Sequence, residues 1–141
     1  MQKVLQTTNI DSDQLATAEP GFPVDVITGK PLYPLTNHTV SAAGTNGKVI
    51  KASKGAWLGL ICSNQTGAAK FVKLYDKATA PTVGTDIPKL TIGIPANWSR
   101  EIGVQPTAFQ NGIAMAITGA AADNDATAVA AGDVAVDVFY L

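Results

Sequence analysis

Between Ala69 and Leu141 this chain consists of short stretches in which apolar and polar residues alternate, separated by turns of small residues. Alternation with a period of two places every second side chain on the same face of a β-strand. The separating turns contain Gly, Asn, Asp and Pro, which tolerate or preset the backbone angles of tight turns. Because 13 Gly and 8 Pro also disfavour long helices, the pattern predicts an all-β protein.

Seven strands are expected from the alternation, each with one face toward a core and one toward solvent. Around Lys73, the side chains of Phe71 and Tyr75 are expected on the outer, wet face of their strand. The expected inward side chains of two other strands are Leu90, Ile92 and Ile94, and Val134, Val136, Val138 and Tyr140. The seven strands are expected at residues 48–53, 56–63, 69–75, 89–94, 99–104, 113–118 and 134–141.

Strands of this length and spacing favour a β-sandwich or jelly roll over a helical or doubly wound fold. The 141 residues fit a single domain. Alternation alone does not separate a jelly roll from an immunoglobulin-like sandwich, so the residues leave the strand order open. The alanine-rich segment at residues 120–131 is interpreted as a long loop, with a short helix as the alternative.

The first 47 residues differ from the rest because they are rich in proline and contain no long apolar run. Proline fixes φ and donates no backbone hydrogen bond, so residues 1–47 are expected to form an extended arm or loop. Short strands are expected within it at residues 3–8 and 24–28. Its apolar side chains predict packing on the body, residues 48–141, or on a neighbouring subunit.

The charges are unevenly spread, although the net charge is only −1, which excludes a broadly basic nucleic-acid binder. Residues 48–77 contain six lysines and one acid, Asp76, whereas residues 101–141 contain five acids and no base. This distribution predicts a basic side and an acidic side suited to contacts with a charged protein surface. The alternative is a scatter of solvated lysines. The six lysines are Lys48, Lys51, Lys54, Lys70, Lys73 and Lys77.

Few residues have the chemistry of a catalytic or metal site. His38 is the single histidine, so the paired histidines of a cupin-type metal site cannot be assembled, and only Ser41 and Asp25 lie near it in sequence as triad partners. The segment Asp123 to Asp125 lacks the central Gly and terminal Glu of an EF-hand loop, which favours a turn. Cys62 is alone, and a buried inert thiol is expected.

The start of the chain has no apolar core of a secretory signal, and no apolar run is long enough to cross a bilayer. Synthesis in the cytosol is therefore expected, and the sequons at Asn37, Asn64 and Asn97 are interpreted as chance. Trp57 heads an apolar strand and is expected in the core. Trp98 follows a turn and is the candidate for an exposed anchor, such as a sugar-stacking platform.

Two segments carry a resemblance, KLYDKATAPTVGTDIP at residues 73–88 and GIAMAITGAAADNDATAVAAGDVAV at residues 112–136. Together they are similar to the C-terminal half of small virion proteins of tailed bacteriophages, encoded near the major capsid protein. In particular they resemble the jelly-roll capsid cement, or decoration, proteins of podophages, such as that of a Bordetella phage. The resemblance covers about half the chain. It implies a jelly roll that dimerises and clamps neighbouring capsid subunits from outside the shell.

The function expected from these observations is that of a non-enzymatic capsid cement protein, a homodimer that bridges major capsid subunits on the outer surface of the virion. No cofactor, metal, nucleic acid or membrane partner is expected. The alternatives are a carbohydrate-binding adhesin module of a phage tail or spike, and a small hydrolase or isomerase. Residues expected to contact the capsid or a neighbouring subunit are Phe22, Tyr33, Lys48, Lys51, Lys54, Trp98, Phe139 and Leu141.

Overall fold

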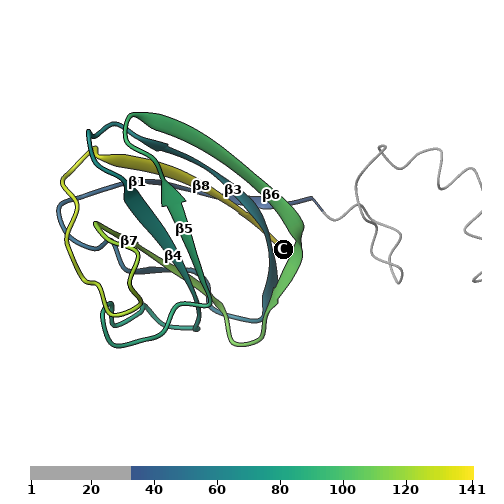
Figure 1. The fold of residues 1–141 in the computed structure, drawn as a ribbon. Helices are drawn as coiled ribbons and strands as arrows, with labels where there is room; N and C mark the ends of the chain where they lie inside the picture. Colours follow the sequence, from purple (N-terminus) through teal and green to yellow (C-terminus); the bar gives the residue numbers. More distant parts are fainter. Residues whose placement is uncertain (1–32) are drawn as a thin grey trace, which may run out of the picture. The chain divides into compact units, whose positions relative to one another are not determined.

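A computed structural model describes residues 33–141 of the chain, except for the side chains of Val104 and Gln105. The chain divides into residues 1–34 and residues 35–141, and the second unit is a sandwich of two four-stranded antiparallel sheets (Figure 1). The strands expected at residues 3–8 and 24–28 lie outside the described residues. The eight strands are β1 (Leu35–Val40), β2 (Lys48–Lys51), β3 (Gly55–Asn64), β4 (Lys70–Asp76), β5 (Leu90–Ile94), β6 (Trp98–Phe109), β7 (Ile113–Thr118) and β8 (Val134–Tyr140).

The strand order is that of a jelly roll. One sheet has the order β1-β8-β3-β6 and the other the order β2-β7-β4-β5. The first strand thus pairs with the last, the second with the seventh, the third with the sixth and the fourth with the fifth, as when one long hairpin is rolled into two Greek keys. This order distinguishes the fold from an immunoglobulin-like sandwich, which the alternation of residues could not do.

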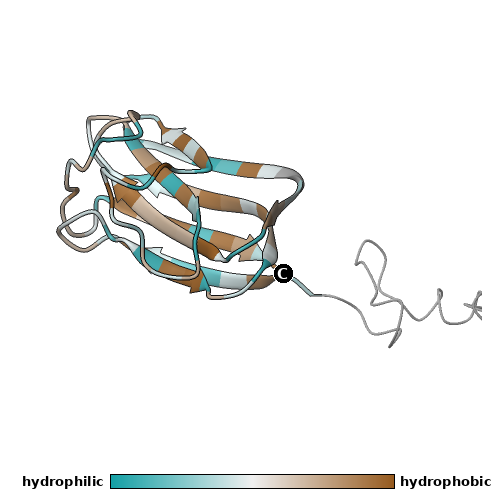
Figure 2. Ribbon diagram, turned by 90° about the horizontal axis from the view of Figure 1, so that it is seen from below, coloured by the Kyte–Doolittle hydropathy of each residue, from teal (hydrophilic) through white to brown (hydrophobic). Residues whose placement is uncertain are grey.

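The core lies between the two sheets and contains the inward side chains that the alternation predicted. Ile92, Ile94 and the three valines of β8 are buried, and Leu90 and Tyr140 pack against them. Figure 2 shows the brown, apolar stretches of the strands on both sheets. Trp57 is also buried in this core, as expected. A register shift between Trp57 and Gly59 changes which side chains of β3 point inward, so that Trp57 and Leu60 both reach the core.

The outer face of the β2-β7-β4-β5 sheet is covered at its centre, which corrects the expectation of a wet face there. Lys73 and Tyr75 are fully buried, and so are all six residues of β7. Val83, from the connection between β4 and β5, packs against the cluster of Tyr75, Ala114 and Ala116. The ammonium of Lys73 donates hydrogen bonds to the carbonyls of Ala122 and Asp125 (the latter at 3.1 Å), which holds the connection between β7 and β8 over the same face.

The connection between β7 and β8 is a loop, as expected, with turns and one isolated bridge from Val129 to Gly44. The carboxylate of Asp125 organises it by accepting hydrogen bonds from the Ala120 N–H at 3.0 Å and the Thr127 hydroxyl at 2.6 Å. Burial alone would raise the pKa of Asp125, but these hydrogen bonds and the nearby charge of Lys73 lower it below its ordinary value.

Two expected boundaries differ from the structure. The sandwich begins at Leu35 rather than at residue 48, because β1 pairs with β8 along its whole length. Most side chains of β1 are exposed, so its sequence lacks the apolar alternation of a half-buried strand. Strand β6 continues to Phe109 through Pro106, where a turn was expected. Proline is tolerated there because β6 is an edge strand with one side free of ladder hydrogen bonds.

Replacing Lys73 by Met tests how strongly its ammonium holds the β7–β8 loop. The variant keeps a long apolar stem but leaves the carbonyls of Ala122 and Asp125 without their donor, which is expected to lower the free energy of unfolding by about 1–3 kcal/mol. Lys54→Met is the matched control, because Lys54 is exposed and makes no ion pair with any residue from 33 to 141, and a change within about 0.5 kcal/mol is expected. Denaturant unfolding measures both. Equal losses in the two variants would contradict the proposed holding role.

Candidate interaction surface

The residues with catalytic or metal-binding chemistry are engaged in structural contacts. The Ser41 hydroxyl donates to the Ala130 carbonyl at 2.8 Å and accepts from the Val134 N–H at 3.1 Å, so it ties β1 to the end of the β7–β8 loop. Cys62 is buried, and burial raises the pKa of its thiol, as expected for an inert cysteine. Residues 33–141 contain no group of three His, Cys, Asp or Glu side chains placed to hold a metal ion.

His38 lies on the outer face of the first sheet, where it contacts a carboxylate of the neighbouring strand. Its Nδ1 is 2.7 Å from Oδ1 of Asp137, and 62 % of the His38 side chain is exposed. The two residues are directly opposite each other in the β1–β8 ladder. The pair is therefore a cross-strand contact of the sheet surface, and Ser41 is not part of it. Asp25 lies outside the described residues.

The structure divides the lysine cluster into two groups. Lys70 and Lys77 pair with Asp133 and Asp86 at 3.6 and 2.6 Å, and Lys73 is buried beneath the β7–β8 loop. These three charges are therefore compensated within the protein. Lys48, Lys51 and Lys54 make no ion pair with any residue from 33 to 141. We call these three residues the basic strip.

The basic strip follows β2 and the turn into β3. Lys48 and Lys51 are the two ends of β2 and are half-buried, while Lys54 is exposed in the turn. Partial burial lowers the pKa of Lys48 from its ordinary value. The stem of Lys51 crosses Gly55 so closely that a side chain at that position would collide with it. The strip is thus held by the main chain of β2 and by packing at the turn.

Leu141 lies next to the basic strip at one end of the sandwich. A shallow depression of about 360 Å³ there is lined by Lys54, Ala56, Phe109 and Leu141, among others. Leu141 is held against β3 there, because the main chains of Ala56 and Leu141 exchange hydrogen bonds of 2.9 and 2.8 Å. The predicted contact residues Lys51, Lys54 and Leu141 are therefore brought together.

The other predicted contact residues lie apart. Phe139 is half-buried on the outer face of the first sheet, opposite Thr36 and Gly59. Tyr33, which precedes β1, is 50 % exposed. Trp98 is 61 % exposed at the start of β6, the far end of this strand from Phe109. Phe22 lies outside the described residues.

Sequence reasoning missed three exposed apolar side chains of the first sheet. Leu35, Val40 and Ile61 are 54, 55 and 42 % exposed. The surrounding residues explain why Val40 and Ile61 were not expected to be exposed. Val40 lies in a segment that was assigned to the arm. Ile61 lies in the apolar run WLGLICS, which is typical of a buried strand. The register shift in β3 is what turns Ile61 outward. A bulge of this kind leaves little trace in the residue pattern.

The chain matches no protein-family model and no curated protein. Among solved structures it is similar to the Tobacco streak virus coat protein, with a TM-score of 0.31 and 11 % sequence identity over 79 % of this chain and 86 % of the coat protein. A likeness at this level is too weak to support an argument about function. The part of the chain that is described contains no helix that is long and apolar enough to cross a membrane.

Fluorescence quenching separates the two tryptophans. Trp98 is exposed and Trp57 is 2 % exposed, so acrylamide is expected to quench the Trp98 emission and to leave that of Trp57 largely protected. In Trp98→Phe the remaining emission should resist quenching, whereas Trp57→Phe, the matched control, should retain the quenchable part. Strong quenching in Trp98→Phe would show that Trp57 is not enclosed by the sandwich.

Proposed function

We propose that this protein is a non-enzymatic capsid cement protein of a tailed bacteriophage. It binds the outside of the shell as a homodimer and bridges neighbouring major capsid subunits. The observation that carries the proposal is the division of the lysines. Lys70 and Lys77 pair with carboxylates and Lys73 is buried against carbonyls, whereas Lys48, Lys51 and Lys54 make no ion pair with any residue from 33 to 141. Positive charges without partners of their own are suited to an acidic protein surface.

The two segments that resemble phage cement proteins support the proposal because they are neighbours in the fold. Residues 73–88 comprise most of β4 and the connection that follows it, and residues 112–136 comprise β7, its loop and the start of β8. Strands β4 and β7 pair side by side, and the two connections cover the same face of their sheet. Apart from residues 134–136 of β8, which belong to the other sheet, the similarity is thus gathered in one layer of the sandwich.

A cement protein must hold two subunits together against the pressure of packaged DNA. A body whose loops are tied to its sheets transmits force without unfolding locally, and the buried Lys73 ties one such loop. Two modest contacts made by one dimer bind firmly because the second contact forms at a high effective concentration. A strip of three lysines on each protomer suits this bivalent attachment.

The proposal is tested by binding to purified, expanded shells that lack this protein. A variant with Lys48, Lys51 and Lys54 replaced by Gln is expected to bind about tenfold more weakly or worse at low salt, since exposed charge contacts contribute up to about 1 kcal/mol each. The wild-type affinity should fall as salt approaches 1 M, where the screening length is about 3 Å. Cosedimentation with the shells measures both.

The matched control replaces the same three lysines by Arg, which keeps the charges and is expected to preserve binding. Equal weakening of shell binding in the Gln and Arg variants would show that the positive charge of the three lysines does not contribute to the binding. Failure of the wild-type protein to bind expanded shells at any salt concentration would refute the proposed function itself.

A second candidate function is favoured by Trp98. This side chain is 61 % exposed and follows Asn97, whose positive φ of 50° forms the turn that presents the ring. Exposed aromatic rings of this kind stack on sugars in binding modules, so the protein is alternatively a carbohydrate-binding adhesin of a phage tail or spike. Under that alternative, a glycan array should show sugar binding that disappears in Trp98→Ala. An array without binding by the wild-type protein would exclude it.

A further inference from the structure

The sandwich has four edge strands, and three of them are guarded against pairing with another chain. At one side, the ammonium of Lys89 donates to the Ala108 carbonyl of β6 at 2.6 Å, and the Arg100 guanidinium donates to the Gly93 carbonyl of β5 at 2.9 Å. At the other side, β2 carries two lysines and a register shift. Side-chain cations and bulges of this kind are how natural proteins prevent edge-to-edge association.

The fourth edge strand, β1, has none of these guards. Its sequence, LTNHTV, contains no Lys, Arg, Pro or Gly, and it pairs with β8 over six consecutive residues without a register shift. Leu35 and Val40 at its two ends are more than half exposed. Within the described part of the chain, β1 is therefore a regular edge strand that is open to a further strand.

The free hydrogen-bonding groups of β1 belong to alternate residues. The N–H of Ser41 points to β8, where it donates to the Val134 carbonyl at 2.8 Å. Because main-chain groups alternate in direction along an antiparallel strand, Thr36, His38 and Val40 direct their N–H and C=O groups away from β8. The close contact of the His38 and Asp137 side chains fits this assignment, since side chains approach most closely in pairs that are not hydrogen-bonded. These groups have no hydrogen-bond partner among residues 33–141.

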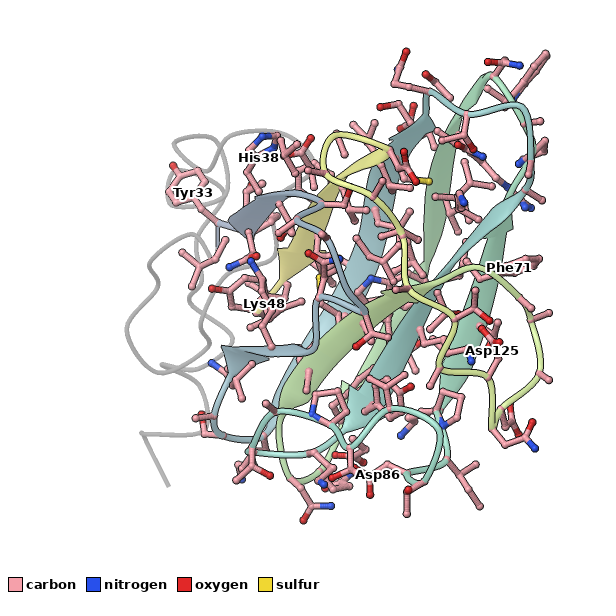
Figure 3. All side chains as sticks on the ribbon, turned by 90° about the vertical axis from the view of Figure 1, so that its left-hand side faces the viewer. Tyr33, His38, Lys48, Phe71, Asp86 and Asp125 are labelled. Atoms are coloured by element: carbon pink, nitrogen blue, oxygen red, sulfur yellow. The ribbon has the colours of Figure 1, made fainter. Side chains whose placement is uncertain are left out.

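Lys48, the first lysine of the basic strip, lies on the same side of the sandwich as this free edge. Met115 of β7 joins the two, because Lys48 is its partner in the β2–β7 ladder and the Thr39 hydroxyl of β1 contacts its sulfur at 4.0 Å. Figure 3 likewise shows His38 and Lys48 on one side of the view, away from Asp86 and Asp125. The sheets of a sandwich pack about 10 Å apart, so side chains on an added strand would come within reach of Lys48.

We infer that β1 accepts an extended strand from a partner protein, and that this strand carries acidic side chains on the face turned toward the basic strip. Main-chain hydrogen bonds to Thr36, His38 and Val40 supply the affinity, as in other cases of strand addition. The lysines select acidic partners by charge complementarity. The inference deepens the proposed function, on which it rests for the partner's identity, by stating which chemistry a shell subunit contributes.

A second copy of this chain fits the edge less well. Antiparallel pairing of two β1 strands about a twofold axis would place His38 of one protomer opposite its counterpart. It would also bring the two basic strips toward each other, with Lys48 and Lys51 of each copy unpaired. Like charges brought close together across an interface disfavour such a dimer. Self-pairing through β1 is therefore an outcome that overturns the inference.

The test uses the full chain and two capped heptapeptides, one of alternating Glu and Thr and one of alternating Lys and Thr. On titration with the acidic peptide, the amide signals of Thr36, His38 and Val40 in NMR spectra are expected to shift and their hydrogen exchange to slow. The basic peptide should bind at least tenfold more weakly at low salt. A version of the acidic peptide N-methylated at alternate residues cannot complete the ladder, and it should not bind.

Substitutions on the protein separate the main-chain contribution from the charge. His38→Pro removes an outward N–H that the sandwich does not use, and it should abolish binding of the acidic peptide, whereas His38→Ala, its matched control, should retain it. The triple variant with Lys48, Lys51 and Lys54 replaced by Glu should prefer the basic peptide. If His38→Pro fails to fold, the N-methylated peptide still tests the ladder on the unaltered protein.

Three results would overturn the inference: equal binding of the acidic and basic peptides, shifts confined to residues outside β1 and the basic strip, or pairing of β1 with a second copy. The proposed function fails separately. Peptide binding without attachment to shells refutes the capsid role and leaves the strand-accepting edge intact, whereas attachment to shells without peptide binding refutes the edge and leaves the capsid role.

Discussion

The arrangement of this protein depends on one buried cation. Lys73 lies in the middle of β4, and its ammonium is held by two carbonyls of the β7–β8 loop. Burying a charge without such partners would be very costly, so the loop must lie where it does for the strand to stay in the sheet. One face of the second sheet is thereby closed. On the first sheet, by contrast, the side chains of Val40 and Ile61 are 55 and 42 % exposed.

Most of the other lysines also have partners within the protein. Lys77, Lys89 and Lys70 each lie within 4 Å of a carboxylate, and Asp76 accepts hydrogen bonds from the N–H groups of the turn between β6 and β7. Among residues 33–141, the basic strip is left without an ion pair, and its Lys48 lies near β1, an edge strand without a lysine or a register shift. In the proposed mode of attachment, the main-chain groups of β1 and the lysines of β2 together form the binding face.

The sequence predicted most of the fold because its strands are half-buried. Leu90, Ile92 and Ile94 alternate with polar residues and do face the core. The prediction failed for strands that are buried on both faces and for the strand that is mostly exposed. Lys73 was expected to face solvent but is buried, and β1 is too exposed to show alternation. Both errors have the same origin, since a loop closing over a sheet and a strand pairing at its edge are tertiary events without a local pattern.

The candidate surface was predicted only in part. The lysines Lys48, Lys51 and Lys54 were named from sequence, but nothing there distinguished them from Lys70 and Lys77, because ion pairs with Asp133 and Asp86 depend on how the chain folds. The free edge of β1 could not be found either, since strand order was open. What the residues indicated was a basic side of the molecule, with a scatter of solvated lysines as the alternative.

A cryo-electron microscopy map of assembled particles that contain this protein tests the central claim most directly. The account predicts density for the jelly roll on the outside of the shell, with β1 and the lysines of β2 turned toward acidic groups of a shell subunit. A map in which that side faces solvent and the protein is attached through the loops over β4 and β7, or one in which the particles lack the protein, would contradict it.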